Sequence, residues 1–180
     1  APVFSHSSAA LIHGLPEWGL PLRRVAVCED GPTPRSRTTS LTTFRTAPGL
    51  SDEVMTVNGL RVTTPARTVT DIAISTPRDA SVAVADAALY GEIVTRDALD
   101  ESLRRSAGRR GIRRARQSLS VVDGRSKSVA ESLSRLTFHD FGLPEPEPQV
   151  DVFTSRGVRV ARVDFLWREE GGIGGGEGFG

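Results

Sequence analysis

The sequence predicts an α/β protein in which a small β-sheet precedes an array of helices, followed by an incomplete αββ unit. Short runs rich in β-branched residues occupy the first third of the chain, and one pair of them encloses an Asn-Gly turn. Four short segments with helical periodicity come next. After residue 126 the pattern changes to one helix and two strands with alternating apolar residues. We therefore expect a scaffold region over 1–122, a second unit over 123–168 and a disordered glycine-rich tail over 169–180.

Length and composition exclude several classes of protein. The 180 residues suffice for one ordinary domain or two small ones, and 38% hydrophobic with 25% charged residues is typical of globular proteins. No apolar run approaches the roughly 20 residues that span a bilayer, and the first residues do not resemble a signal peptide. The single Cys28 excludes an internal disulfide and a cysteine zinc site. We expect a cytoplasmic protein without membrane contacts.

The first elements are predicted from caps and turns. Ser5 or Ser7 can cap a helix that Gly14 ends. Asn58-Gly59 joins two β-rich runs, and this pair tolerates the positive φ of a type I′ turn. The ranges expected are 5–16 for the helix, 22–29 and 41–47 for two strands around a polar loop at 30–40, and a hairpin over 53–64.

Four helices follow the hairpin. Thr64 is the expected N-cap of the first, with Pro65 at its first position, where the missing N–H costs nothing. Gly91 is expected to end the second helix, and Thr95 to cap the third. The fourth buries Ile112 and Leu119 on one face. The four expected helices begin near residues 64, 78, 95 and 111, respectively.

The αββ unit begins with a capping box, in which Ser128 caps a helix and Glu131 returns the contact. Gly142 is expected to end this helix. A proline-containing extended segment leads to two strands that turn at Arg156-Gly157. Asp164 would lie in the middle of the second of these strands, where an Asp is disfavoured.

Glu131 and Asp164 could therefore be the carboxylates of a metal site. A helix acid and a strand acid can hold Mg²⁺ beside a phosphate, where the ion neutralises charge and activates water. The alternative is structural. Glu131 is fully explained by the capping box, and Asp164 could pair with an arginine such as Arg135.

Residues 104–127 carry a net charge of +8 and could bind phosphates. Arg110, Arg113 and Arg116 lie off the apolar stripe of their helix and can share one surface. The alternative is a solvated helix face, since the chain has 22 Arg and one Lys, as a GC-rich gene would produce. The candidate nucleic-acid-binding residues are Arg105, Arg109, Arg110, Arg113, Arg114 and Arg116. His6 and His13 have no third ligand in view, so we expect packing or capping roles for them.

Two strings resemble a known family. "SHSSAALIHGLP" and "VNGLRVTTPARTVTDIA", with the "VADAALYGEIVTRDAL" that follows, are similar to actinobacterial antitoxins of the AbiEi abortive-infection type. The resemblance covers about residues 4–122. It implies an antitoxin-like regulatory protein that binds DNA and contacts a toxin partner. The family usually begins with a winged helix-turn-helix, which does not precede Ala1, so we expect truncation at this end.

Residues 123–167 resemble the start of a very-short-patch-repair endonuclease domain of the PD-(D/E)xK superfamily. The resemblance implies a restriction-endonuclease-like core in which Glu131, Gln149 and Asp164 are catalytic, with Glu131 and Asp164 holding Mg²⁺. That domain continues with an apolar strand bearing a further acid. Here a glycine-rich tail with Glu177 follows, so we expect an incomplete, inactive site. A DNA-associated regulator is favoured, with a Mg²⁺-dependent endonuclease and a toxin-binding module as alternatives.

Overall fold

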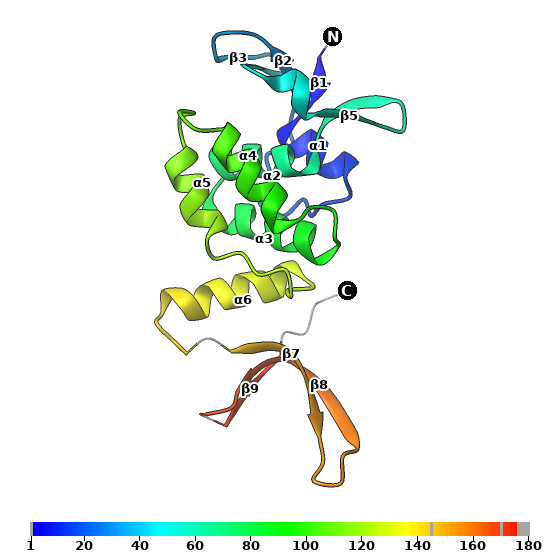
Figure 1. Cartoon of the computed structure of the whole chain (residues 1–180), viewed down its shortest axis with the longest axis vertical. Helices are drawn as coiled ribbons and strands as arrows, with labels where there is room; N and C mark the ends of the chain where they lie inside the picture. Colours follow the sequence, from blue (N-terminus) through cyan, green and yellow to red (C-terminus); the bar gives the residue numbers. More distant parts are fainter. Residues whose placement is uncertain (1, 145, 170, 176–180) are drawn as a thin grey trace.

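The α/β class is confirmed. The computed structural model describes residues 2–144, 146–169 and 171–175 of the chain. This part contains two β-sheets and six α-helices. Figure 1 shows the larger sheet at one end, the helices α1–α5 beside and below it, and α6 with the smaller sheet at the other end.

The larger sheet is mixed, with the strand order β3-β4-β2-β1-β6-β5. β1 lies in the middle, antiparallel to β2 and parallel to β6, and β2 is parallel to β4. The outer pairs are antiparallel, and Asn58 and Gly59 at the β5–β6 turn have φ of 50° and 79°, as predicted. The strands are β1 (Val3–Phe4), β2 (Val25–Asp30), β3 (Arg35–Thr38), β4 (Thr42–Ala47), β5 (Val54–Val57) and β6 (Leu60–Thr63), with a 3₁₀ turn at Leu50–Glu53.

Two strands of this sheet were not predicted. β1 has two residues, too few to show an alternating pattern. β3 lies inside the expected polar loop, and all four of its residues are exposed, so it has no apolar face to recognise. β3 pairs with β4, the next strand along the chain, in a hairpin that the polar sequence does not signal.

The predicted N-caps are confirmed. Thr64, Thr95 and Ser128 each accept a hydrogen bond from the backbone N–H three residues later. The first helix is shorter than the expected 5–16, and Ser5 sits at its N-cap without a capping side-chain bond. The helices are α1 (His6–Ile12), α2 (Pro65–Ser75), α3 (Arg78–Tyr90), α4 (Arg96–Arg105), α5 (Ile112–Leu119) and α6 (Val129–Asp140).

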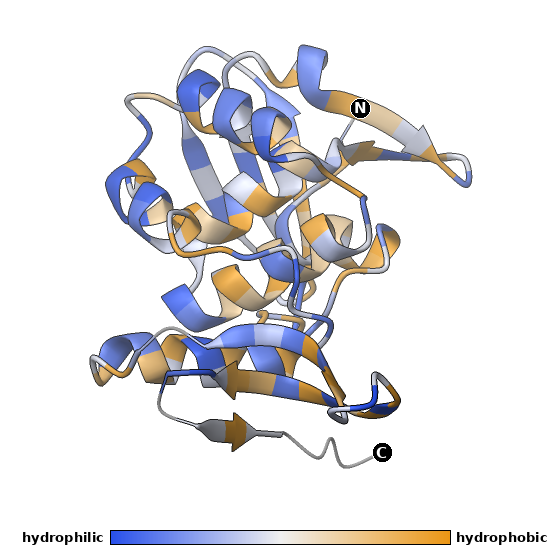
Figure 2. Cartoon of the chain, turned by 60° about the horizontal axis from the view of Figure 1, so that its bottom comes forward, coloured by the Kyte–Doolittle hydropathy of each residue, from blue (hydrophilic) through white to orange (hydrophobic). Residues whose placement is uncertain are grey.

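One apolar core joins the helices. Its fully buried members include Ile72 of α2, Val84 of α3 and Leu99 of α4, and Leu136 of α6 belongs to the same cluster. α6 therefore packs on the helical array, through α3, and its Phe138 contacts Phe165 and Trp167 of β8. Figure 2 shows apolar and polar residues on each helix and alternating along β7 and β8. Of these two strands only Phe165 is buried.

The smaller sheet is antiparallel, with the order β7-β8-β9. β7 (Glu147–Phe153) and β8 (Arg159–Trp167) form the predicted hairpin, with Gly157 at φ 76° in the turn. Part of the tail that was expected to be disordered forms a third strand, β9 (Gly172–Gly174), paired with residues 165–167. Glu177 lies outside the described residues.

None of the helices in the described part of the chain combines the length and apolar character needed to cross a membrane.

Candidate functional site

The six candidate arginines separate into two groups. Arg105 pairs with Glu101 on its own helix, at 2.9 Å from Nε to Oε1. Arg109 places a guanidinium nitrogen 2.6 Å from Oδ1 of the buried Asp71. Arg114 donates to the backbone carbonyl of Ile74, at the end of α2. Arg109 and Arg114 therefore connect the α4–α5 region to α2.

The other group is Arg110, Arg113 and Arg116. All three are exposed, and across the described residues none has a hydrogen-bond or ion-pair partner. Arg113 and Arg116 lie one turn apart on α5, and Arg110 directly precedes Gly111, which caps this helix with φ 93°. We call these three residues the α5 arginine surface. As predicted, they lie off the face that buries Ala115 and Leu119.

Asp71 is the centre of a buried charge network. Arg67 bonds Oδ1 of Asp71 at 3.0 Å and forms an ion pair with Glu53, and Arg109 adds a second bond to Oδ1. Burial opposes the ionisation of Asp71, but interactions with His6, which is charged only in acid, and with Arg67 and Arg109 outweigh it and lower the pKa of this carboxyl. The network has two guanidinium groups and two carboxylates, so its net charge is zero.

His6 borders this network. It is 5% exposed with φ 50°, and Nδ1 lies 3.0 Å from Oγ of Ser5 and 4.0 Å from Oδ2 of Asp71. Burial lowers the pKa of His6 to about 4, so the imidazole is neutral at pH 7. His13 has the expected packing role, with Nε2 2.8 Å from the carbonyl oxygen of Thr63. Arg67 and Asp71 are one helical turn apart in sequence, but nothing in the sequence brings His6 to them.

Glu131, Gln149 and Asp164 lie together between α6 and the smaller sheet. Nε2 of Gln149 donates to Oε2 of Glu131 at 2.9 Å and to Oδ1 of Asp164 at 3.1 Å. Glu131 is 8% exposed and also accepts from the Lys127 backbone, so it has both of the roles considered for it: helix cap and cluster member. Asp164 is half-buried.

Gln149 reaches both carboxylates because its backbone departs from the extended conformation. Its φ is 56°. In the antiparallel pairing of β7 with β8, Pro148 pairs with Phe165 and Val150 with Val163, and Gln149 between them is unpaired. Positive φ at a residue other than glycine is strained and is often found at functional sites. Oε1 of Gln149 is buried and has no hydrogen-bond partner within the described part of the chain. This strained conformation is a feature that sequence reasoning missed.

The register of β9 brings residue 175 next to this cluster. A Cβ at Gly175 would lie 3.9 Å from Oδ2 of Asp164. Within the described residues, no group of three or more His, Cys, Asp or Glu side chains is placed to hold a metal ion. The two carboxylates suit Mg²⁺, which binds through one or two carboxylates and keeps several waters, while the amide of Gln149 turns its Nε2 and not its oxygen toward them.

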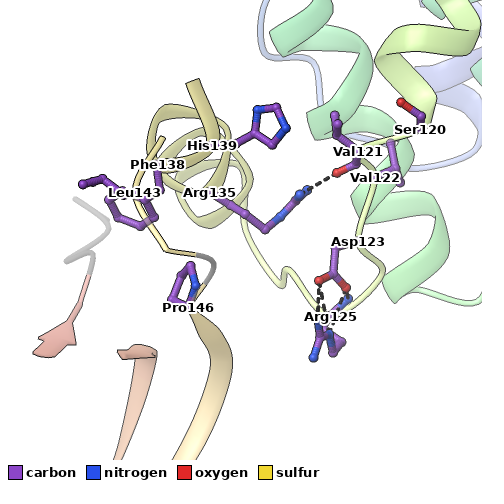
Figure 3. Close-up of a pocket in the computed structure, with 10 residues that line it drawn as sticks. All are labelled: Ser120, Val121, Val122, Asp123, Arg125, Arg135, Phe138, His139, Leu143 and Pro146. Carbon is purple, nitrogen blue, oxygen red and sulfur yellow. Dashed lines mark hydrogen bonds and ion pairs between the residues drawn. The ribbon is translucent and has the colours of Figure 1, made fainter. Parts of the chain in front are cut away.

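Arg135 does not pair with Asp164, the structural alternative considered for that acid. Its guanidinium bonds Oδ2 of the buried Asp86 at 2.7 Å and the carbonyl of Val121, because α6 packs on α3. Figure 3 shows this side chain crossing a cavity of about 380 Å³ at the junction between α6 and residues 120–125. The cations that line the cavity have carboxylate partners, Asp86 for Arg135 and Asp123 for Arg125. The cavity carries no excess charge.

A family model for the AbiEi antitoxin C-terminal domain matches residues 5–121. The chain belongs to this family. The matched region contains β2–β6, α1–α5 and the α5 arginine surface, and it ends before α6 and the Glu131 cluster.

Two uncharacterized proteins of Mycobacterium tuberculosis, from strains CDC 1551 and H37Rv, are relatives of this AbiEi-family chain. Each is 39% identical over 111 residues, which are 62% of this chain and 41% of the relative. The chain thus spans about two fifths of the length of the curated relatives it matches. No solved structure matches it.

Proposed function

We propose that the chain is a DNA-associated regulatory protein of antitoxin type, from a bacterial toxin–antitoxin or phage-defence system. Membership of the AbiEi antitoxin C-terminal domain family supports the antitoxin part of this proposal. The observation that supports DNA contact is the α5 arginine surface. Arg110, Arg113 and Arg116 are exposed, and no carboxylate in the described residues neutralises them.

These arginines would bind DNA through its phosphates. A guanidinium that neutralises a phosphate releases condensed counterions, so each contact adds affinity that salt weakens. Such contacts position a protein on the duplex without reading its sequence. Arg105, Arg109 and Arg114 contribute less, because they already bond Glu101, Asp71 and Ile74.

Replacing the α5 arginine surface tests this function. The variant R110A/R113A/R116A should bind a fluorescent duplex about tenfold or more weaker than the wild type, measured by anisotropy at about 0.1 M salt. A matched control removes three exposed arginines of β8 and its flank, R159A/R162A/R168A, which have carboxylate partners. The control loses the same charge and should keep most of the affinity.

Equal affinity of wild type and R110A/R113A/R116A would exclude the α5 surface from DNA contact. The helical array would then be the candidate surface for the toxin partner that an antitoxin counteracts. Co-purification of such a partner without nucleic acid would support that interpretation.

A Mg²⁺-dependent endonuclease is the second candidate function. The observation in its favour is the cluster of Glu131, Gln149 and Asp164, with the strained backbone of Gln149 and its buried amide oxygen. Glu131 and Asp164 would hold the ion, and Gln149 would orient water or a phosphate oxygen. The ion would supply charge neutralisation and an acidified water beside the scissile phosphate.

Metal binding can be measured apart from catalysis. This candidate predicts that Asp164→Asn weakens Mn²⁺ binding, followed by calorimetry, by about tenfold, and that it removes Mg²⁺-dependent nicking of a supercoiled plasmid. Gly175→Asp would place a third carboxylate beside Asp164 and should tighten Mn²⁺ binding. Unchanged Mn²⁺ affinity in both variants would exclude this cluster as a metal site.

A further inference from the structure

A second cavity lies beside the Asp71 network, where α1 and the end of α2 meet β2, β4 and the segment before β2. Its volume is about 190 Å³. The polar side chains that line it include His6, Ser7, Thr43 and three arginines, Arg23, Arg24 and Arg45. Of the described residues that line it, none carries a carboxylate. Neither the antitoxin family nor the α5 arginine surface accounts for this site.

The positive charge of the cavity is not cancelled by the network beneath it. Arg67 and Arg109 are balanced by Glu53 and Asp71, and His6 is neutral at pH 7 because burial lowers its pKa to about 4. The three cavity arginines are therefore in excess.

Arg45 is the most constrained of these cations. It is half-buried, and among the described residues its guanidinium donates no hydrogen bond and forms no ion pair within 4 Å. Burial lowers the pKa of Arg45, and the more distant charge of Asp71 opposes this effect. A guanidinium with five N–H donors that is partly removed from water requires an acceptor.

We propose that this cavity binds a phosphate group. A guanidinium matches the geometry of phosphate oxygens with two parallel hydrogen bonds, which Arg45 can supply. Arg23 and Arg24 lie exposed at the rim, where they add charge. His6 uses Nδ1 toward Ser5, so its Nε2 remains to hydrogen-bond the ligand.

The volume limits the ligand to the phosphate and its nearest ester atoms. The cavity holds roughly six waters at about 30 Å³ each. It is smaller than the about 300 Å³ of the smallest typical small-molecule pockets, so a whole nucleotide does not fit inside. The group can belong to a free phosphorylated compound or to a nucleic-acid backbone, and the second source rests on the proposed DNA-binding function.

Calorimetry with inorganic phosphate at low ionic strength tests the site on the full chain. The wild type should bind about one phosphate per chain, and Arg45→Gln should weaken this binding about tenfold or more. R23Q/R24Q changes only exposed rim residues and should weaken it severalfold without a change in thermal stability. Arg156→Gln, an exposed arginine at the β7–β8 turn outside the cavity, is the control and should bind phosphate as the wild type does.

Duplex binding by the same variants distinguishes the two sources. Loss of phosphate binding in Arg45→Gln with unchanged duplex affinity indicates a free phosphate compound, and parallel loss of both indicates the DNA backbone. The absence of saturable phosphate binding in the wild type would overturn the proposal. So would equal phosphate affinity in the wild type, Arg45→Gln and R23Q/R24Q. Failure of DNA binding alone would contradict the proposed DNA-binding function but not the phosphate site.

Discussion

His6 links the stability of the fold to pH. Its imidazole is buried beside the Asp71 network, and burial lowers its pKa from the usual 6.5 to about 4. Between these two values the unfolded chain binds a proton at this residue and the folded chain does not. The contribution of the neutral His6 to the free energy of unfolding is therefore fully present above pH 6.5 and is lost as pH falls toward 4.

This linkage predicts a loss of about 3 kcal/mol in the free energy of unfolding between pH 6.5 and pH 4, from 2.5 pH units at about 1.36 kcal/mol each. Urea unfolding across this range measures it. His6→Asn removes the titrating ring and tolerates the positive φ of this position. The variant should show a flatter pH dependence, and an unchanged slope would mean that His6 does not titrate as described.

Residue identity alone did not separate the structural arginines from the exposed ones. Arg109 and Arg110 are neighbours in one run, yet Arg109 bonds the buried Asp71 and Arg110 has no partner in the described part of the chain. The periodicity of α5 correctly placed Arg113 and Arg116 on the surface, because it depends only on the helix's own apolar stripe. The partner of Arg109 comes from α2, which local sequence does not reveal.

At the scale of elements, α6 is attached to the helical array by the buried Arg135–Asp86 ion pair, together with Leu136 in the shared core and the more exposed Arg78–Asp140 pair. Arg135 bonds Asp86 of α3 and the Val121 carbonyl, and the Asp123 backbone N–H donates to the other oxygen of Asp86. Burial raises the pKa of Asp86 despite the charge of Arg135. The carboxylate therefore depends on this arginine to remain ionised.

Arg135→Ala should lower the free energy of unfolding by about 3 kcal/mol at pH 7, because it leaves Asp86 buried without its counter-charge. Urea denaturation measures the loss. D86N/R135M removes both charges and keeps an acceptor for the Asp123 N–H, so it should recover part of the stability. A variant Arg135→Ala as stable as the wild type would show that α6 does not depend on this pair.

The sequence predicted those elements whose signals are local. Caps at Thr64, Thr95 and Ser128 and the Asn58-Gly59 turn were all correct, since each depends on residues within one turn of chain. β1 was missed because pairing with distant strands holds it, and β3, which pairs with the next strand along the chain, was missed because it has no buried face. β9 was missed because glycine is a weak strand former.

At the scale of the whole molecule, the two candidate sites lie in different parts of the chain. The α5 arginine surface belongs to the family domain, and the Glu131 cluster lies between α6 and the smaller sheet (Figure 1). The sequence and its resemblances anticipated the meeting of Glu131, Gln149 and Asp164. The phosphate cavity could not be anticipated, because the adjacent Arg23 and Arg24 and the more distant Arg45 of β4 come together only through the mixed sheet.

The salt dependence of DNA binding tests the central claim most directly. Binding of one duplex by the wild type, R110A/R113A/R116A and R159A/R162A/R168A is measured over a range of salt concentrations. We expect the slope of log K against log salt to fall in magnitude by about 2.7 in R110A/R113A/R116A, at about 0.9 for each of three phosphates, and to change little in the control. Equal slopes in all three proteins would contradict the assignment of the α5 arginine surface to DNA.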